Sequence, residues 1–142
     1  MAQEINISTT LSWSRGGASI IAKVSGKEDQ IGTTAIEDVQ IIGSTSETIT
    51  FGDVTDPSHV FFKNENKLWS QLTTAQQLPY GSQANYEAVN TVNLGTTNPA
   101  TALNATIKLK PQQGIPLINP QAAWFGISNG DDVDLLVVAI QR

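Results

Sequence analysis

The sequence predicts an all-β protein, an antiparallel β-sandwich with the jelly roll as one variant. Short apolar stretches, many of them alternating apolar with polar residues, recur about eight to ten times, and clusters of Gly, Pro, Asn, Asp and Ser separate them. The polar residues are mainly Thr, Asn, Ser and Gln, and only 15% of residues are charged, which suits sheet faces better than exposed helices. A chain of 142 residues is long enough for one buried core, so we expect a single domain over residues 1–142.

The N-terminal stretches predict a β-hairpin. Apolar residues alternate with polar ones over residues 5–13, and residues 18–25 repeat the alternation after a Gly-Gly turn. Residues 26–34 are expected to form an exposed loop. Residues 1–7 are a candidate extended arm that adds a strand to the sheet edge of a neighbour.

We place the nucleus of the core at residues 49–66. This run predicts a second hairpin, in which a strand containing Ile49 and Phe51 is joined to residues 60–62 through a polar turn. The turn, residues 52–57, contains a glycine, two aspartates and a proline, which favour a change of chain direction.

The remaining stretches are assigned in chain order. Residues 35–43 favour a strand over a short helix, and residues 68–82 lack a clean period, which predicts a short irregular or helical insertion. The last strand is apolar on both faces, so it should lie centrally in a sandwich or against a partner subunit. The other predicted strands are residues 85–94, residues 103–109, the proline-bounded edge strand or arm 114–118, and a final pair, 122–127 and 133–140, joined at an Asn-Gly hairpin turn.

Composition and charge argue against several classes of function. The net charge of -5 disfavours binding to a nucleic-acid backbone, and we interpret the pair Lys108 and Lys110 as a solvated strand face. The absence of cysteine excludes a thiol nucleophile and thiolate metal sites. The N-terminus lacks the pattern of a signal peptide, and no apolar run reaches the roughly 18 residues of a membrane helix. We therefore expect a soluble protein made in the cytosol, with no nucleic-acid or membrane partner.

The only histidine, His59, follows Asp53 and Asp56 in the turn of the second predicted hairpin. A hydrolase would need this residue as a base beside a serine nucleophile. Because the chain has no GxSxG motif, we interpret His59 as a turn or strand-start residue.

A loop rich in oxygen ligands precedes the last strand. Asn129, Asp131, Asp132 and Asp134 are ligands that calcium would accept, but their spacing does not follow the EF-hand pattern. Acidic turns of this kind are common between strands without a metal. We therefore expect no catalytic residue, no metal and no cofactor.

The large aromatic residues divide into two groups. Trp13 and Trp124 lie in alternating strands and are expected in the core, whereas Trp69 and Tyr80 lie in the irregular segment and are freer to face a partner. Flat aromatic rings also suit sugar stacking. Trp69 with Tyr80 is the pair that would form such a platform.

Five runs of sequence carry a resemblance to a known class of protein. In chain order they are TFGDVTDPSHVFFKN, VNLG, IKLKPQQGIPL, AAWFGIS and DLLVVAIQR. Their layout resembles that of small virion structural proteins of tailed bacteriophages, in particular the β-sandwich proteins that decorate or cement capsids. The resemblance covers about residues 48–142 and does not include residues 1–47. The run LWSQLTTAQQLPYGSQANYE is an insertion relative to the short members of this class.

The resemblance implies a structural role without catalysis. Such a protein binds the outer surface of the shell formed by the major capsid protein, stabilises it, and is located on the capsid surface of the virion after synthesis in the host cytoplasm. It also implies a homo-oligomer, with a trimer favoured. Apolar residues in irregular segments are the expected contacts, although they could instead cover the end of the sandwich. These candidate interface residues are Trp69, Leu72, Leu78, Tyr80, Ile115 and Leu117.

Two other classes of function stay open. The first is a component of a tail or head fibre, or a carbohydrate-binding module that recognises a glycan on the host surface through Trp69 and Tyr80. The second, more distant, is an enzyme that uses His59.

Overall fold

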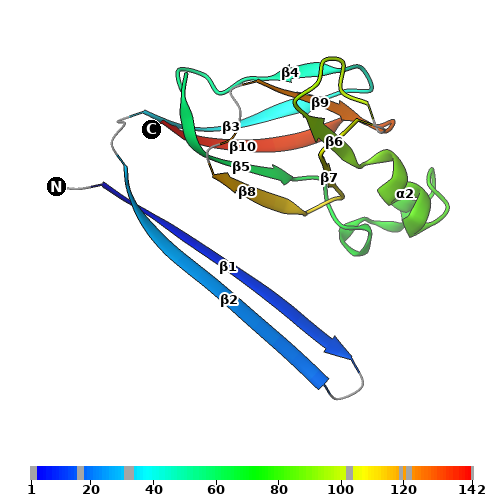
Figure 1. Ribbon diagram of the computed structural model, residues 1–142. Coiled ribbons are helices and arrows are strands. Elements are labelled where there is room, and N and C mark those ends of the chain that lie inside the picture. Colours follow the sequence, from blue (N-terminus) through cyan, green and yellow to red (C-terminus); the bar gives the residue numbers. More distant parts are fainter. Residues whose placement is uncertain are drawn as a thin grey trace. The chain divides into compact units, whose positions relative to one another are not determined.

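The computed structural model describes residues 3–15, 18–30, 34–101, 104–118, 120 and 123–141. Contacts between residues divide the chain into two compact units, Met1–Thr33 and Thr34–Arg142 (Figure 1). We call the first unit the ribbon and the second the sandwich. The expectation of one domain over residues 1–142 stays a prediction.

The ribbon consists of two antiparallel strands, β1 (Gln3–Arg15) and β2 (Ala18–Gln30). Their register runs from Gln3 opposite Gln30 to Arg15 opposite Ala18, which confirms the predicted N-terminal hairpin. Both strands are longer than expected. Residues 3–7 of the candidate arm pair with residues 26–30, which were expected in a loop. The alternation of β1 continues to the start of the strand, so the facing residues of β2 form backbone pairs with it over the same length.

The sandwich contains two antiparallel four-stranded sheets, which confirms the predicted all-β architecture. One sheet has the order β3-β10-β5-β8 and the other has the order β4-β9-β6-β7. The first sheet is built from β3 (Ala35–Ile42), β10 (Val133–Gln141), β5 (Pro57–Asn64) and β8 (Gly114–Ile118). The second is built from β4 (Glu47–Ile49), β9 (Trp124–Ser128), β6 (Val92–Gly95) and β7 (Ile107–Leu109).

The strand pairs of the sandwich are nested. The first strand pairs with the last, β3 with β10, and the pairs β4 with β9, β5 with β8 and β6 with β7 follow inward. The sandwich is therefore one long hairpin rolled into two sheets, which is the jelly-roll arrangement.

Both hairpins predicted within the sandwich are wrong. The stretch 49–66 does not form one, because β4 and β5 lie in different sheets, and neither does the final pair, because β9 and β10 also lie in different sheets. The turn residues do reverse the chain, but in each case the chain crosses from one sheet to the other. The apolar residues on either side of the first turn still meet in the core, where the rings of Phe51 and Phe62 lie 6.3 Å apart.

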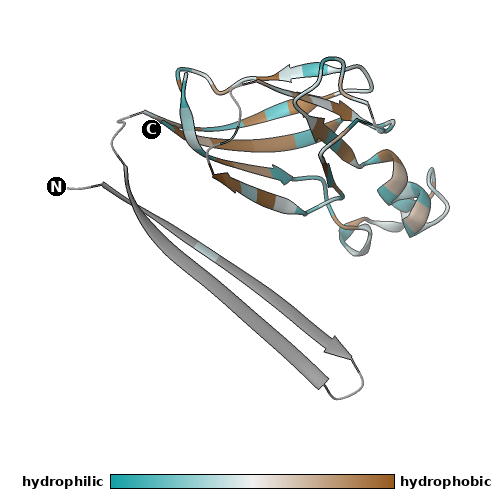
Figure 2. Ribbon diagram, viewed as in Figure 1, coloured by the Kyte–Doolittle hydropathy of each residue, from teal (hydrophilic) through white to brown (hydrophobic). Residues whose placement is uncertain are grey.

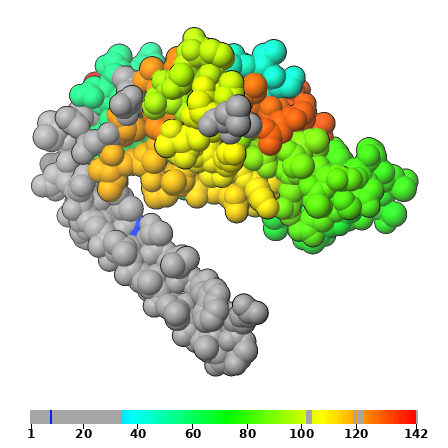
Figure 3. All heavy atoms as spheres, turned by 45° about the vertical axis from the view of Figure 1, so that its right-hand side comes forward, coloured from blue at the N-terminus to red at the C-terminus, as the bar shows by residue number. Residues whose placement is uncertain are grey.

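The predicted strand 85–94 is wrong in its first half. Residues Gln83–Val89 form helix α2, and the Ser82 side chain caps its start by accepting a hydrogen bond from the Asn85 backbone N–H. Tyr86 and Asn90 suggested a strand because they are an even number of residues apart, but residues four apart also share one face of a helix. Before α2, the predicted insertion contains the short helices η1 (Trp69–Gln71) and α1 (Thr74–Gln77). Figure 3 shows this region, in green, at one end of the sandwich.

The core lies between the two sheets. Phe62 is fully buried, and its ring packs against that of Trp124 at 5.5 Å, which places Trp124 in the core as predicted. Trp13 lies outside the residues whose side chains the structure describes. The sheets approach closely at Gly126 of β9, where an added Cβ would lie 3.3 Å from the side chain of Ile42 on β3.

Neighbouring phenylalanines on β5 test this arrangement. Phe62 faces the core, whereas Phe61 is half-buried on the opposite face. We expect Phe62→Ala to lower the free energy of unfolding by about 3–5 kcal/mol, because it leaves a cavity, and Phe61→Ala to lower it by no more than about half as much. Chemical denaturation followed by circular dichroism measures both, and equal losses would contradict the assignment of the two faces.

Candidate functional site

The outer face of the β3-β10-β5-β8 sheet is apolar. Residues on alternate positions of β10 fill the core, and the residues between them point to the other side of the sheet. The large apolar residues that are exposed on this side are Ile41 (63%), Ile118 (55%) and Val39 (51%). We call this surface the outer sheet face; its apolar members are Val39, Ile41, Phe61, Ile118, Leu136, Val138 and Ile140.

Apolar residues run in rows across this face. One row pairs Val138 of β10 with Phe61 of β5, and the next pairs Ile140 with His59, which pairs in turn with Ile118. Figure 2 shows that β10, at the centre of the sheet, is apolar along most of its length. The apolar residues on the central strands of this face are half-buried, and the exposed ones lie on the two edge strands. Exposed apolar residues on one sheet face favour an interaction surface.

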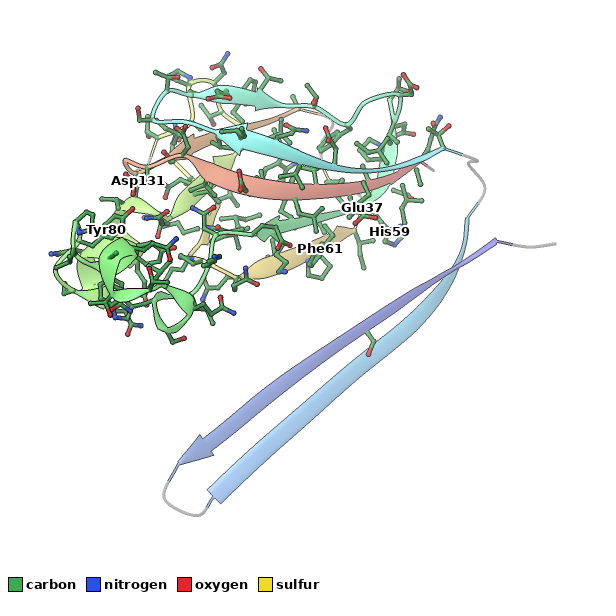
Figure 4. The ribbon with its side chains drawn as sticks, turned by 180° about the vertical axis from the view of Figure 1, so that it is seen from behind. Glu37, His59, Phe61, Tyr80 and Asp131 are labelled. Carbon is green, nitrogen blue, oxygen red and sulfur yellow. The ribbon has the colours of Figure 1, made fainter. Side chains whose placement is uncertain are left out.

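Polar groups lie around the apolar rows. Glu37 lies opposite Val138 on the edge strand β3, and Figure 4 shows it near His59 and Phe61. Lys63 is on β5 and forms an ion pair of 2.8 Å with Glu65. An apolar centre with a polar rim is the usual composition of a protein interface.

The insertion contains an aromatic cluster of its own. The buried ring of Tyr86 lies between Trp69, at 5.8 Å, and Tyr80, at 4.9 Å, and its planes with theirs form angles of 48° and 78°. The hydroxyl of Tyr86 donates to the backbone carbonyl of Lys67 at 2.7 Å. Trp69 and Tyr80 therefore each pack against Tyr86, and since their planes form such different angles with its plane, they are not the coplanar platform considered from the sequence.

Asp131 joins this cluster to the loop before β10. One of its oxygens, Oδ2, accepts from the Tyr80 hydroxyl at 2.7 Å and from Asn90 Nδ2 at 3.1 Å (Figure 4). The hydrogen bond to Asp131 raises the pKa of Tyr80 above its ordinary value, and burial and the charge of Asp131 act in the same direction. Burial is the main cause that raises the pKa of Tyr86.

The acidic loop is used for contacts within the fold. Besides the contacts of Asp131, Asn129 Oδ1 accepts from Asn93 Nδ2 at 2.6 Å. Among the residues described here, no group of three or more His, Cys, Asp or Glu side chains is arranged to hold a metal ion.

A cavity of about 490 Å³ lies beside the aromatic cluster. Amides and carboxylates line it together with the two tyrosine rings. Of the predicted interface residues, it includes Leu72 and Tyr80. The sequence analysis did not identify its polar members, since isolated Asn and Gln residues carry no spacing signal. The lining residues are Glu65, Asn66, Lys67, Leu72, Gln76, Pro79, Tyr80, Tyr86, Asn90 and Asp134.

The predicted interface residues fall into three environments. Leu78 is exposed (74%), whereas Trp69, Leu72 and Tyr80 are half-buried within the insertion. Ile115 and Leu117 of β8 pack against the core. The neighbouring Ile118 points outward and belongs to the outer sheet face. The sequence analysis did not single out this face, although the two apolar faces of β10 were the signal for it.

His59 is buried on β5, and its Nδ1 lies 3.0 Å from Ser58 Oγ. Ser58 is also buried, and its hydroxyl donates to the carbonyl of Ile140 at 3.2 Å. Asp53 and Asp56 are exposed in the preceding turn. A serine held in this way, away from solvent, has the geometry of a structural contact between β5 and β10.

Lys108 and Lys110, the pair predicted to be a solvated strand face, differ in their contacts. Lys110 forms an ion pair of 3.0 Å with Glu87 of α2, and Lys108 is exposed. Hydrogen bonds from Gln83 and Lys110 lower the pKa of Glu87.

Comparisons with known proteins give no relative. No protein-family model matches the chain, and neither curated proteins nor solved structures show a significant similarity to it. Within the described residues, no helix has the length and apolar character needed to cross a membrane.

The tyrosine contacts predict a pH dependence. Tyr80 and Tyr86 are the two tyrosines of the chain, and folding raises the pKa of both, so their contribution to stability is present below pH 10 and is lost as the pH rises through their folded pKa values. We expect the phenolate absorbance to appear at a higher pH than the value near 10 that is usual for tyrosine. The variant Asp131→Asn should move part of this titration to lower pH. Spectrophotometric titration, with circular dichroism to monitor unfolding, measures this. An unchanged titration in Asp131→Asn would contradict the role of Asp131.

Proposed function

We propose that this protein is a non-enzymatic virion structural protein, a capsid decoration or cement protein. It binds the outer surface of the major capsid protein shell through the outer sheet face and stabilises the shell. The observation that carries this proposal is the apolar surface on the side of the β3-β10-β5-β8 sheet opposite the core.

The fold supports the proposal in a general way. Jelly rolls form capsid proteins of viruses and also lectin domains, so the fold favours a binding role over catalysis but does not select the partner. The resemblance of residues 48–142 to small phage virion proteins is the argument for a capsid. That resemblance also favours a trimer.

The outer sheet face has the chemistry that such binding requires. Removing apolar surface from water contributes about 25 cal/mol per Å². A stable interface buries about 800 Å² on each partner. The polar groups at its rim, such as Glu37 and Lys63, then fix orientation more than affinity.

The first test is the abundance of the protein in purified particles. We expect quantitative mass spectrometry to find a copy number within a few-fold of that of the major capsid protein, because a protein that cements a shell covers many equivalent positions. A handful of copies per particle would instead indicate a tail or fibre component. Absence from the particle would refute the virion role.

The second test locates the surface that binds. We expect the double variant Ile41→Ser, Ile118→Ser to weaken binding to shells that lack the protein by at least about tenfold, because both side chains lose apolar contact. Thr48→Ala, an exposed substitution on the outer side of the other sheet, is the matched control and should bind normally. Co-sedimentation with the shells measures binding. Loss of binding in Leu78→Ser but not in the double variant would place the contact on the insertion instead.

A second candidate is a carbohydrate-binding module. The observation that favours it is the cavity beside the aromatic cluster, because aromatic rings with amides and carboxylates are the groups that bind sugars. A tail or fibre position in the particle, as tested above, would favour this function.

A further inference from the structure

We propose that β1 pairs with β1 of a second copy of this chain, antiparallel and centred on Thr9. The two ribbons then form one four-stranded sheet with the order β2-β1-β1-β2. This pairing deepens the self-association that is part of the proposed function, but it involves the ribbon alone and does not require a capsid.

The first argument is that the ribbon has open edges. Within its described residues the sheet contains only β1 and β2, so each of these 13-residue strands has one edge that no strand of the sheet pairs. A sheet of two strands is marginally stable by itself, and a long unpaired edge is a template for another strand. Either edge of the ribbon can therefore accept a further strand.

The second argument is that β1 is complementary to itself. A two-fold axis perpendicular to the sheet pairs each residue with one that lies on the same face, at an equal distance from Thr9. On one face of the four-stranded sheet this pairing places apolar residues opposite each other, and on the other face it places polar residues opposite each other. The pairs are Ile7 with Leu11, Ile5 with Trp13, Ser8 with Thr10, Asn6 with Ser12, Glu4 with Ser14 and Gln3 with Arg15.

The third argument is the difference in charge between the two edges. Residues 5–14 of β1 contain no charged residue, whereas β2 contains Lys23, Lys27, Glu28 and Asp29. Charged residues on an edge strand oppose pairing with another strand. Over its full length β2 would also pair poorly with itself, because a centre at its middle residue places an isoleucine opposite Glu28 and another opposite Lys27. The joining edge is therefore that of β1.

The pairing has a consequence for symmetry. The same edge of both copies meets, so the contact is closed and two-fold. The ribbon thus makes a dimer, and the trimer that the resemblance favours would need a separate contact through another surface. Within the ribbon, Thr9 lies opposite Val24 of β2. In the dimer, Thr9 also lies opposite Thr9 of the other copy, across the other edge of β1.

Charge exchange at Thr9 tests the pairing in the full-length protein. In the dimer, Thr9→Lys places two lysines opposite each other and Thr9→Glu places two glutamates opposite each other, so we expect each variant alone to dimerise at least about fivefold more weakly than the wild type. An equimolar mixture should recover the dimer, since Lys then faces Glu. Ser25→Lys is the matched control, because it adds the same charge to β2, which pairs with β1 of its own ribbon and lies away from the joining edge, and it should dimerise normally. Sedimentation equilibrium measures the dissociation constants.

Cross-linking tests the register in the same protein, which has no natural cysteine. Directly opposite residues are close enough for a disulfide, so Thr9→Cys should give a covalent dimer under mild oxidation. Val24→Cys, on β2, should not. Three results would each overturn the proposal. The wild type could be a monomer at tens of micromolar, Val24→Cys could give as much covalent dimer as Thr9→Cys, or the mixture of Thr9→Lys and Thr9→Glu could fail to recover the dimer. Because these measurements use purified protein without shells, their failure is distinguishable from failure to bind a capsid.

Discussion

The position of β10 is the constraint on which the rest of the sandwich depends. This strand is paired on both edges, with β3 and with β5, and it is apolar on both faces. Its residues Val133, Leu135, Val137 and Ala139 are fully buried and join the core between the sheets. Since β3 is the first strand of the sandwich and β10 the last, their pairing closes the roll, and the other strand pairs are nested inside it.

Asn64, at the end of β5, holds the insertion against the roll. Its side chain is fully buried, and its Nδ2 donates to the backbone carbonyls of Asn90, at 2.8 Å, and Leu109, at 3.0 Å. A buried amide is costly unless its hydrogen bonds are made, so this residue ties the end of α2 and the end of β7 to β5. The insertion can then contain its own aromatic cluster without disturbing the strand order.

The proposed binding roles rest on three different regions of the protein. The outer sheet face offers exposed apolar residues on its edge strands, and the cavity beside the aromatic cluster offers amides and carboxylates beside two tyrosines. The ribbon offers an uncharged strand edge. The groups that suggested chemistry in the sequence have structural partners instead: His59 lies beside Ser58, and Asp131 accepts hydrogen bonds from Tyr80 and Asn90. The proposed contacts with a shell and with a second copy of the chain therefore rest on different regions of the protein.

The sequence by itself determined the local structure: the N-terminal hairpin, the all-β class, the edge strand at residues 114–118 and the central position of the last strand. These follow from alternation, turns and prolines, which act between near neighbours. Only the tertiary structure decided that the turns around Asp53 and Asn129 connect different sheets, that residues 83–89 form a helix, and that Val39, Ile41 and Phe61 share the sheet face opposite the core. The physical reason is that a turn reverses the chain without choosing a partner strand. The partner of β3 begins about ninety residues later, and burial of the whole core selects it.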